Sequence, residues 1–172
     1  MDNKKKGIRT AAWILFAIYA AALIKLIVFK DPMWQIRSLL ANWSQEAVAA
    51  HLKTANFIPF HSINLYIRYY YKLKSISFNN LVYNVVAFIP WGIFVPYLHK
   101  KERCFFFTFL TALLFSASIE AFQLVSLLGE CDVDDLILNV AGAVLGYLVY
   151  RWMYPVFVRR PARRKHGRHR RG

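Results

Sequence analysis

The sequence predicts an all-α, polytopic membrane protein with four transmembrane helices. Hydrophobic residues make up 58% of the 172 positions and aromatic residues 17%, which is more apolar surface than a soluble domain of this size can bury. The 23 Lys and Arg residues outnumber the nine Asp and Glu residues, giving a formal net charge of +14. These basic residues gather at the ends of apolar runs, so we expect membrane lipids, and no nucleic acid, as partners of the charge.

Four apolar segments each have about the 20 residues that a helix needs to cross a bilayer. They are Ala11–Phe29, Leu81–Leu98, Cys104–Leu128 and Leu136–Tyr154. The first is expected to be a retained anchor, because it is longer than the apolar part of a signal peptide and no small-residue cleavage site follows it.

Basic residues mark one side of the membrane. Four precede the first span, three lie between the second and third spans, and nine lie from Arg151 onward, which is sixteen of the 23. The turn Gly129–Asp135, between the third and fourth spans, carries none. Because cytoplasmic loops are enriched in Lys and Arg, we expect a multi-pass protein of the cell membrane with both termini in the cytoplasm.

Residues 1–155 are expected to form one membrane domain, and residues 156–172 a basic cytoplasmic tail. The tail is rich in Arg and contains Pro and Gly, so we expect it to be disordered and to lie on anionic lipid head groups.

The long extracellular segment between spans one and two, residues 30–80, is expected to contain interfacial helices. Apolar residues recur at helical spacing between Pro32 and Thr54, and Trp34 and Trp43 suit anchoring at the bilayer surface. A second piece, rich in Tyr and Lys, follows from His61. Two interpretations stay open: these helices only anchor and cap the bundle, or they form a lid over a site.

Polar side chains within the spans gather in the outer half of the predicted bundle. A charge at the centre of a span costs about 2.5–3.5 kcal/mol, so each one requires an explanation. In depth, Asn139 is expected to be level with Glu120 and Gln123 of the third span. One stripe of the fourth span holds, at spacings of 4, 3 and 4, Asp135, Asn139, Gly142 and Gly146. The candidate ligand-binding set is Asn84, Glu120, Gln123, Asp132, Asp134, Asp135 and Asn139.

Several interpretations of this set remain open. The polar groups either hydrogen-bond to one another and hold three helices together, or line an outward-facing pocket. Glu120 and Asp135 would be an acid/base pair if the protein is a membrane enzyme, although no nucleophile elbow and no phosphate-binding Gly loop accompany them. His51 and His61 could join the carboxylates around a divalent cation. The main expectation is that the protein uses no metal and no cofactor.

Four blocks of the sequence resemble the VanZ-like family of bacterial membrane proteins. They are NFIPF (residues 56–60), NVVAFIPWGIFVP (84–96), IEAFQ (119–123) and CDVDDLILNVAGAVLGY (131–147). The last block is the most specific, and together they span just over half of the chain. The resemblance puts weight on Asn56, Pro59, Asn84, Pro90, Gly92, Glu120, Gln123, Asp132, Asp135, Asn139, Gly142 and Gly146.

What the resemblance implies is a phenotype and not a reaction, since the family takes its name from a protein linked to low-level teicoplanin resistance. One departure is that many members carry an Arg shortly before the Asp-rich turn, where this chain has Gly129-Glu130-Cys131. The expected function is an envelope protein that binds a lipid-linked or glycopeptide-type ligand in an outward-facing polar pocket. A membrane enzyme, a small transporter and a purely structural protein are the alternatives, and a homo-oligomer is left open.

Overall fold

The computed structural model describes residues 2–29, 31–69, 76–99 and 105–157. Within these ranges the chain forms helices and a single isolated β-bridge. The helices are α1 (Asp2–Val28), α2 (Met33–Ala41), α3 (Gln45–Thr54), α4 (His61–Arg68), α5 (Ile76–Leu98), α6 (Phe105–Ser126) and α7 (Val133–Phe157). Four of them, α1, α5, α6 and α7, are long and apolar enough to cross a membrane. The prediction of an all-α protein with four spans is confirmed.

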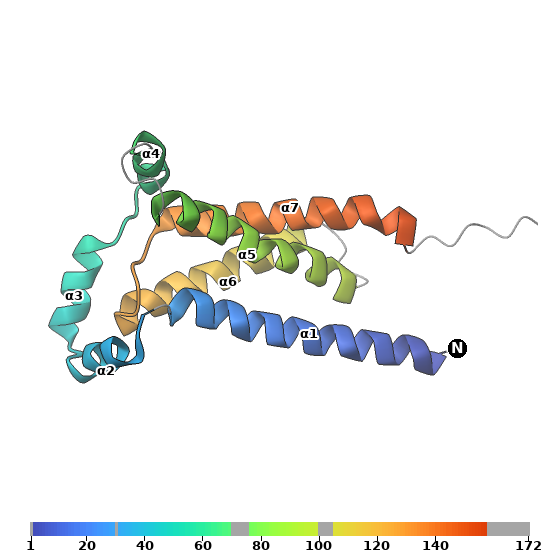
Figure 1. The fold of residues 1–172 in the computed structure, drawn as a ribbon, viewed down its shortest axis with the longest axis horizontal. Helices are drawn as coiled ribbons and strands as arrows, with labels where there is room; N and C mark the ends of the chain where they lie inside the picture. The colour runs from blue at the N-terminus through green and yellow to red at the C-terminus, as the bar shows by residue number, and fades with distance from the viewer. Residues whose placement is uncertain (1, 30, 70–75, 100–104, 158–172) are drawn as a thin grey trace, which may run out of the picture.

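The four long helices run side by side, and the three short helices gather at one end of them (Figure 1). We call α2, α3 and α4 the cap, and the end of the bundle that carries them the cap end. The start of α1 and the end of α7 both lie at the opposite end, which we call the tail end (Figure 1). The predicted tail, residues 156–172, begins inside α7, and its residues 158–172 lie outside the described part of the chain.

The single interfacial region predicted between Pro32 and Thr54 is two helices. Between α2 and α3 the helical conformation is interrupted at residues 42–44. The hydroxyl of Ser44 accepts a hydrogen bond from the backbone N–H of Ala47 at 3.1 Å. A serine that satisfies a free N–H at a helix start favours a new helix there over continuation of the old one.

Helices α5 and α7 make the closest contact in the bundle. A Cβ atom added at Gly142 would lie 2.0 Å from the carbonyl oxygen of Val85, and one added at Gly146 would lie 2.0 Å from that of Ile89. From the other side, a Cβ at Gly92 would lie 2.0 Å from the carbonyl oxygen of Ala143. Only glycine lets two helix backbones approach this far, as the small-residue spacing on α7 predicts.

Aromatic side chains join α1 and α6 to α5, and two hydrogen bonds join α1 to α5. The rings of Trp91 on α5 and Phe115 on α6 stack with their centroids 4.4 Å apart. Helix α1 packs Phe16 against Trp91, and the Tyr19 hydroxyl donates to the carbonyl oxygen of Ala87 at 2.6 Å. Near the tail end, the Arg9 guanidinium donates to the carbonyl oxygen of Leu98 at 3.1 Å.

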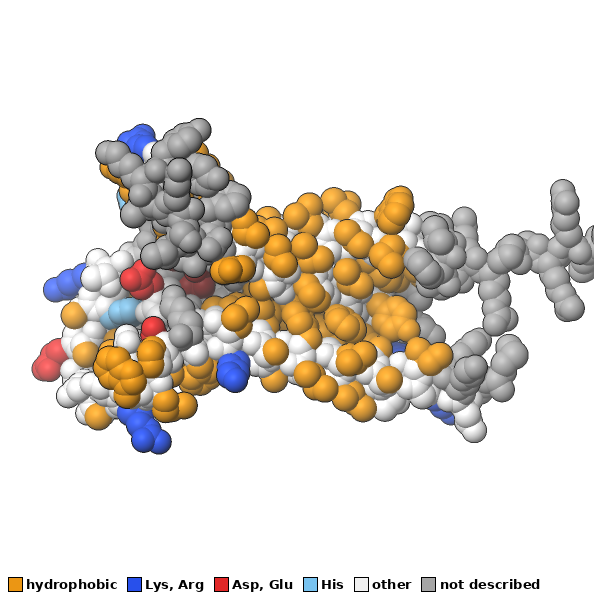
Figure 2. All heavy atoms as spheres, viewed as in Figure 1, with side chains coloured by type: hydrophobic (Ala, Val, Ile, Leu, Met, Phe, Trp, Pro, Cys, Tyr) orange, Lys and Arg blue, Asp and Glu red, His pale blue; other side chains and the backbone are white. Residues whose placement is uncertain are grey.

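The surface of the bundle is apolar, as a protein surrounded by lipid requires. Figure 2 shows hydrophobic side chains over the visible face of the four long helices, while the acidic side chains visible on this face lie at the cap end. Fewer than half of the residues in each spanning window are buried inside the molecule. Large apolar side chains are exposed on each of the four spans, for example Ile14, Val86, Leu114 and Leu148.

Candidate functional site

The cap is fastened to the start of α7 by two aspartates of the Asp-rich turn. Asp132 accepts three hydrogen bonds: Oδ1 from the Asn56 side-chain amide at 2.8 Å and from the Asp134 N–H at 2.8 Å, and Oδ2 from the Ser62 hydroxyl at 2.5 Å. Asn56 lies before α4 and Ser62 lies in its first turn, so Asp132 binds the cap at the start of α4. The two described residues of the cap segment that donate to Asp132, Asn56 and Ser62, are neutral.

Asp134 caps a helix that belongs to another part of the chain. Its side chain is 1% exposed, and its two oxygens accept from the backbone N–H groups of Phe60 at 2.5 Å and Ile63 at 3.0 Å. These are amides at the start of α4, where no residue within the helix supplies a side-chain cap. A carboxylate at a helix N-terminus both satisfies free N–H groups and interacts favourably with the helix dipole.

A short parallel β-bridge completes this attachment. The N–H of Asn56 donates to the carbonyl oxygen of Cys131 at 3.0 Å, and the N–H of Val133 donates to the carbonyl oxygen of Asn56 at 2.9 Å. Backbone and side chain of Asn56 therefore bind the same turn. The connection between α2 and α3 is tied to α6, because the Trp43 indole donates to the carbonyl oxygen of Val125 at 2.8 Å.

Below this attachment, the polar residues of the spans pair between helices. The Asn84 amide on α5 donates to Asp135 on α7 at 2.6 Å. The Asn139 amide on α7 donates to the Ser116 hydroxyl on α6 at 2.9 Å. Asp135 and Asn139, which the sequence places on one stripe, thus contact different neighbours.

The prediction that Asn139 is level with Glu120 and Gln123 is wrong. Asn139 meets Ser116, which lies one helical turn further from the cap end than Glu120. Glu120 is level with the turn before α7, and its Oε2 accepts from the Asp132 N–H at 2.9 Å. The physical reason is that the chain turns back alongside α6 before α7 begins: Asp132, the residue before α7, already meets Glu120, so Asn139 lies further from the cap end.

Gln123 and Gly129 pack against each other inside the turn between α6 and α7. Gln123 is 3% exposed, and its amide lies 3.4 Å from the carbonyl oxygen of Ile27 on α1. A Cβ at Gly129, whose φ is +97°, would lie 2.6 Å from the Gln123 amide nitrogen. This residue is therefore a glycine both for its backbone conformation and for the close approach of Gln123.

Cys131 lies in the same turn and is buried. Burial raises the pKa of its thiol, and the neighbouring carboxylates of Glu120 and Asp132 raise it further. A thiol in such surroundings stays protonated and is a poor nucleophile.

The predicted candidates therefore form a set in which most members hydrogen-bond to one another, to the cap or to Ser116, while Gln123 donates to Ile27 of α1. We call it the acid–amide network: Asn56, Ser62, Asn84, Ser116, Glu120, Gln123, Asp132, Asp134, Asp135 and Asn139. Four of the seven residues predicted as ligand-binding are buried, namely Glu120, Gln123, Asp134 and Asn139, and the other three are half-buried. Glu120 and Asp135, the predicted acid/base pair, hydrogen-bond to different neighbours, Asp132 and Asn84.

The supporting residues of the resemblance have structural positions. Pro59 lies in the exposed turn before α4, and Pro90 lies inside α5, which continues as a helix through it. Gly92, Gly142 and Gly146 form the α5–α7 contact. Over the described ranges, no three His, Cys, Asp or Glu side chains are grouped so as to hold a metal ion.

Two members of the network were not predicted. Ser116 lies four residues before Glu120 on the same face of α6, and this spacing was an available signal. Ser62 has no such signal, because its place beside Asp132 depends on how the cap folds back over the bundle.

Comparison with known proteins follows the same residues. A family model described as VanZ/LLP1 matches residues 16–154. The chain is 29% identical over 136 residues to "Protein VanZ" of Enterococcus faecium, a match that covers 79% of this chain and 71% of that protein. No solved structure matches.

Proposed function

Because this chain belongs to the VanZ/LLP1 family, we propose that it is an envelope protein of the bacterial cell membrane that contributes to resistance to glycopeptides of the teicoplanin type. In this proposal the cap engages a lipid-linked or glycopeptide-type ligand at the outer leaflet. The acid–amide network positions the cap, and its half-buried members Asn84, Asp132 and Asp135 are the predicted candidates nearest to such a ligand.

The proposal requires the cap end to lie outside the cell. The three aspartates Asp132, Asp134 and Asp135 are at the cap end, where the cap also carries Arg37, Lys53 and Arg68. Most of the basic residues, sixteen of the 23, precede the first apolar run, follow the second or lie from Arg151 onward. This asymmetry favours the tail end in the cytoplasm. With this orientation the cap faces the cell wall, where it can meet a lipid-linked or glycopeptide-type ligand.

The observation that carries the proposal is the way Asp134 is used. A carboxylate that is 1% exposed and accepts hydrogen bonds from Phe60 and Ile63 fixes one exposed element, α4, on the bundle. A helix held in a fixed position at the exposed end of the bundle supports a binding role for the cap.

Teicoplanin susceptibility of a sensitive Gram-positive host tests the proposal. Cells that express the chain are expected to need a severalfold higher inhibitory concentration than cells with an empty vector. Asp134→Ala, which releases α4, is expected to lose most of this protection. Glu130→Ala removes an exposed acidic residue four positions earlier and is expected to keep it.

Membrane levels of each variant are measured in the same cells by quantitative immunoblotting. If the chain at full level gives no protection, the proposed resistance function is wrong. If Asp134→Ala at full level protects as well as the original chain, the cap is not the acting part.

A further inference from the structure

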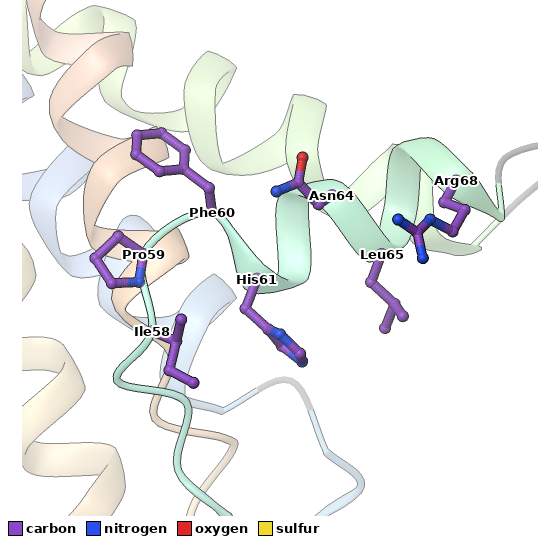
Figure 3. A pocket seen from close by; sticks show the side chains of 7 residues that line it. All are labelled: Ile58, Pro59, Phe60, His61, Asn64, Leu65 and Arg68. Carbon is purple, nitrogen blue, oxygen red and sulfur yellow. The ribbon is translucent and has the colours of Figure 1, made fainter.

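One open cavity of about 270 Å³ lies on the exposed side of the cap (Figure 3). Its wall is the turn before α4, and its floor is one side of α4 itself. The lining residues are Ile58, Pro59, Phe60, His61, Asn64, Leu65 and Arg68. They belong to a single stretch of chain, and none belongs to the acid–amide network.

The lining residues of α4 form one stripe. His61, Asn64, Leu65 and Arg68 are spaced at i, i+3, i+4 and i+7, which places them on the same side of a helix. Figure 3 shows the side chains of His61 and Leu65 on the side of α4 where Ile58 also lies. The cavity thus follows from helical spacing together with the path of the turn before it.

The wall of the cavity is held in an uncommon conformation. Phe60 has a φ of +64°, in the left-handed region that non-glycine residues seldom adopt. Its N–H is bound by the buried Asp134 carboxylate, which also binds Ile63. A conformation of this kind costs about 1–3 kcal/mol and persists only where surrounding contacts impose it.

The chemistry of the lining favours an anion that carries apolar chains. Arg68 supplies a guanidinium and Asn64 an amide, whereas no Asp or Glu is among the seven lining residues. The planar fork of Arg matches the oxygens of a phosphate better than any other side chain does. Ile58 and Leu65 are 65% and 45% exposed and offer apolar contacts next to these donors.

The place of the cavity in the fold favours a lipid phosphate over a soluble one. The cavity lies on α4 at the cap end, where the neighbouring helices α5 and α7 begin. Lipid phosphates are concentrated at this level of a bilayer, and exposed apolar side chains beside basic ones are typical of interfacial helices.

We propose that this cavity binds the phosphate head group of an anionic membrane lipid, with Arg68 and Asn64 on the phosphate and Ile58 and Leu65 against the apolar part. The inference deepens the proposed function and rests on it only for the side of the membrane. Its test uses purified protein, so a failure of lipid binding and a failure of resistance are separate results.

The experiment measures lipid retention by the full chain. Protein reconstituted in vesicles of equal parts phosphatidylglycerol and phosphatidylcholine is released into detergent, and the bound lipids are counted by native mass spectrometry. The chain is expected to retain phosphatidylglycerol in preference. Arg68→Gln is expected to lower this preference about tenfold, the effect of losing a charge-assisted hydrogen bond.

The matched control is Arg37→Gln, which removes an exposed arginine of α2 that does not line the cavity. It is expected to leave the preference unchanged, and Arg68→Lys is expected to retain part of it. Equal effects of Arg68→Gln and Arg37→Gln would overturn the proposal. So would displacement of phosphatidylglycerol by millimolar inorganic phosphate, because the site would then prefer a free anion. Thermal unfolding of each variant identifies any that has lost the fold. If Arg68→Gln has lost it, the test uses the phosphatidylglycerol preference of Arg68→Lys instead.

Discussion

Asp134 illustrates how a buried charge can be stable at the mouth of a membrane span. Its neighbours are two backbone N–H groups that have no partner within their own helix, and it supplies the cap that α4 lacks. Burial therefore costs little, because the carboxylate and the amides satisfy each other. The same logic applies to Asp132, which accepts three hydrogen bonds from neutral donors.

Replacing Asp134 with Ala is expected to lower the free energy of unfolding by about 1–3 kcal/mol, because two amides at the start of α4 lose their acceptor. The measurement is unfolding in mixed detergent micelles, followed by circular dichroism. Glu130→Ala, an exposed neighbour in the sequence, is expected to change stability by less than about 0.5 kcal/mol. Equal stability of the two variants would show that the amides do not depend on Asp134.

The thiol of Cys131 provides a second test at this scale. Because its pKa is raised by burial and then by Glu120 and Asp132, alkylation is expected to be slow at pH 8 in a Cys104→Ser background. Glu120→Gln removes one of the two charges and is expected to speed alkylation severalfold, since the thiolate is the reactive form. Burial persists in this variant, so the rate stays below that of an exposed cysteine. An unchanged rate would mean that Glu120 does not act on the thiol.

The same shift has a consequence for stability. The folded state holds the Cys131 proton more tightly than the unfolded chain does. Its contribution to the free energy of unfolding is therefore complete below the ordinary thiol pKa and is lost as pH rises above it. Cys131→Ser is expected to remove this alkaline loss.

Residue by residue, the sequence predicted which side chains matter better than what they contact. Burial of polar groups in a span is costly, so Asn84, Glu120 and Asp135 could be singled out by their positions in or next to apolar segments. Their partners depend on where helices end, and ends are the least certain part of a helix prediction. The turn between α6 and α7 runs back along α6, and this places Asp132 rather than Asn139 at the level of Glu120.

At the scale of helices, the contact between α5 and α7 is set by glycines. Because Gly142 and Gly146 have no side chains, their backbone can lie directly against carbonyl groups of α5. This contact was predictable, because small residues four apart on a span indicate close packing whatever the partner is. The break between α2 and α3 was not predicted, although Ser44 is a favourable N-cap residue.

Gly142→Ala is expected to destabilise the protein by about 1–3 kcal/mol, because the new methyl group would lie 2.0 Å from the Val85 carbonyl oxygen and the two backbones must separate. Gly7→Ala is the matched control: it is a helical glycine on α1 with no atom within 4 Å of the added Cβ. It is expected to leave the unfolding midpoint unchanged or slightly higher. The measurement is thermal unfolding of both variants in the same detergent. A loss for Gly7→Ala equal to that for Gly142→Ala would contradict the close α5–α7 contact.

For the whole molecule, the two ends of the bundle differ in the side chains that they carry. The tail end carries basic side chains such as Lys6 and Arg9, while the cap end carries the acid–amide network and the exposed cap. Composition and the positions of Lys and Arg were enough to predict four spans and this asymmetry. The folding of the cap onto α7 could not be predicted, since it depends on hydrogen bonds between residues about 70 positions apart.

The proposed function depends most directly on the cap end facing outward. Single cysteines are placed at Lys53 on α3 and at Asn3 on α1, both exposed, in a chain with Cys104→Ser and Cys131→Ser. Intact cells are treated with a membrane-impermeant maleimide. We expect Lys53→Cys to be labelled at once and Asn3→Cys to be labelled only after the cells are permeabilised. Labelling of Asn3→Cys in intact cells, with Lys53→Cys protected, would contradict the account.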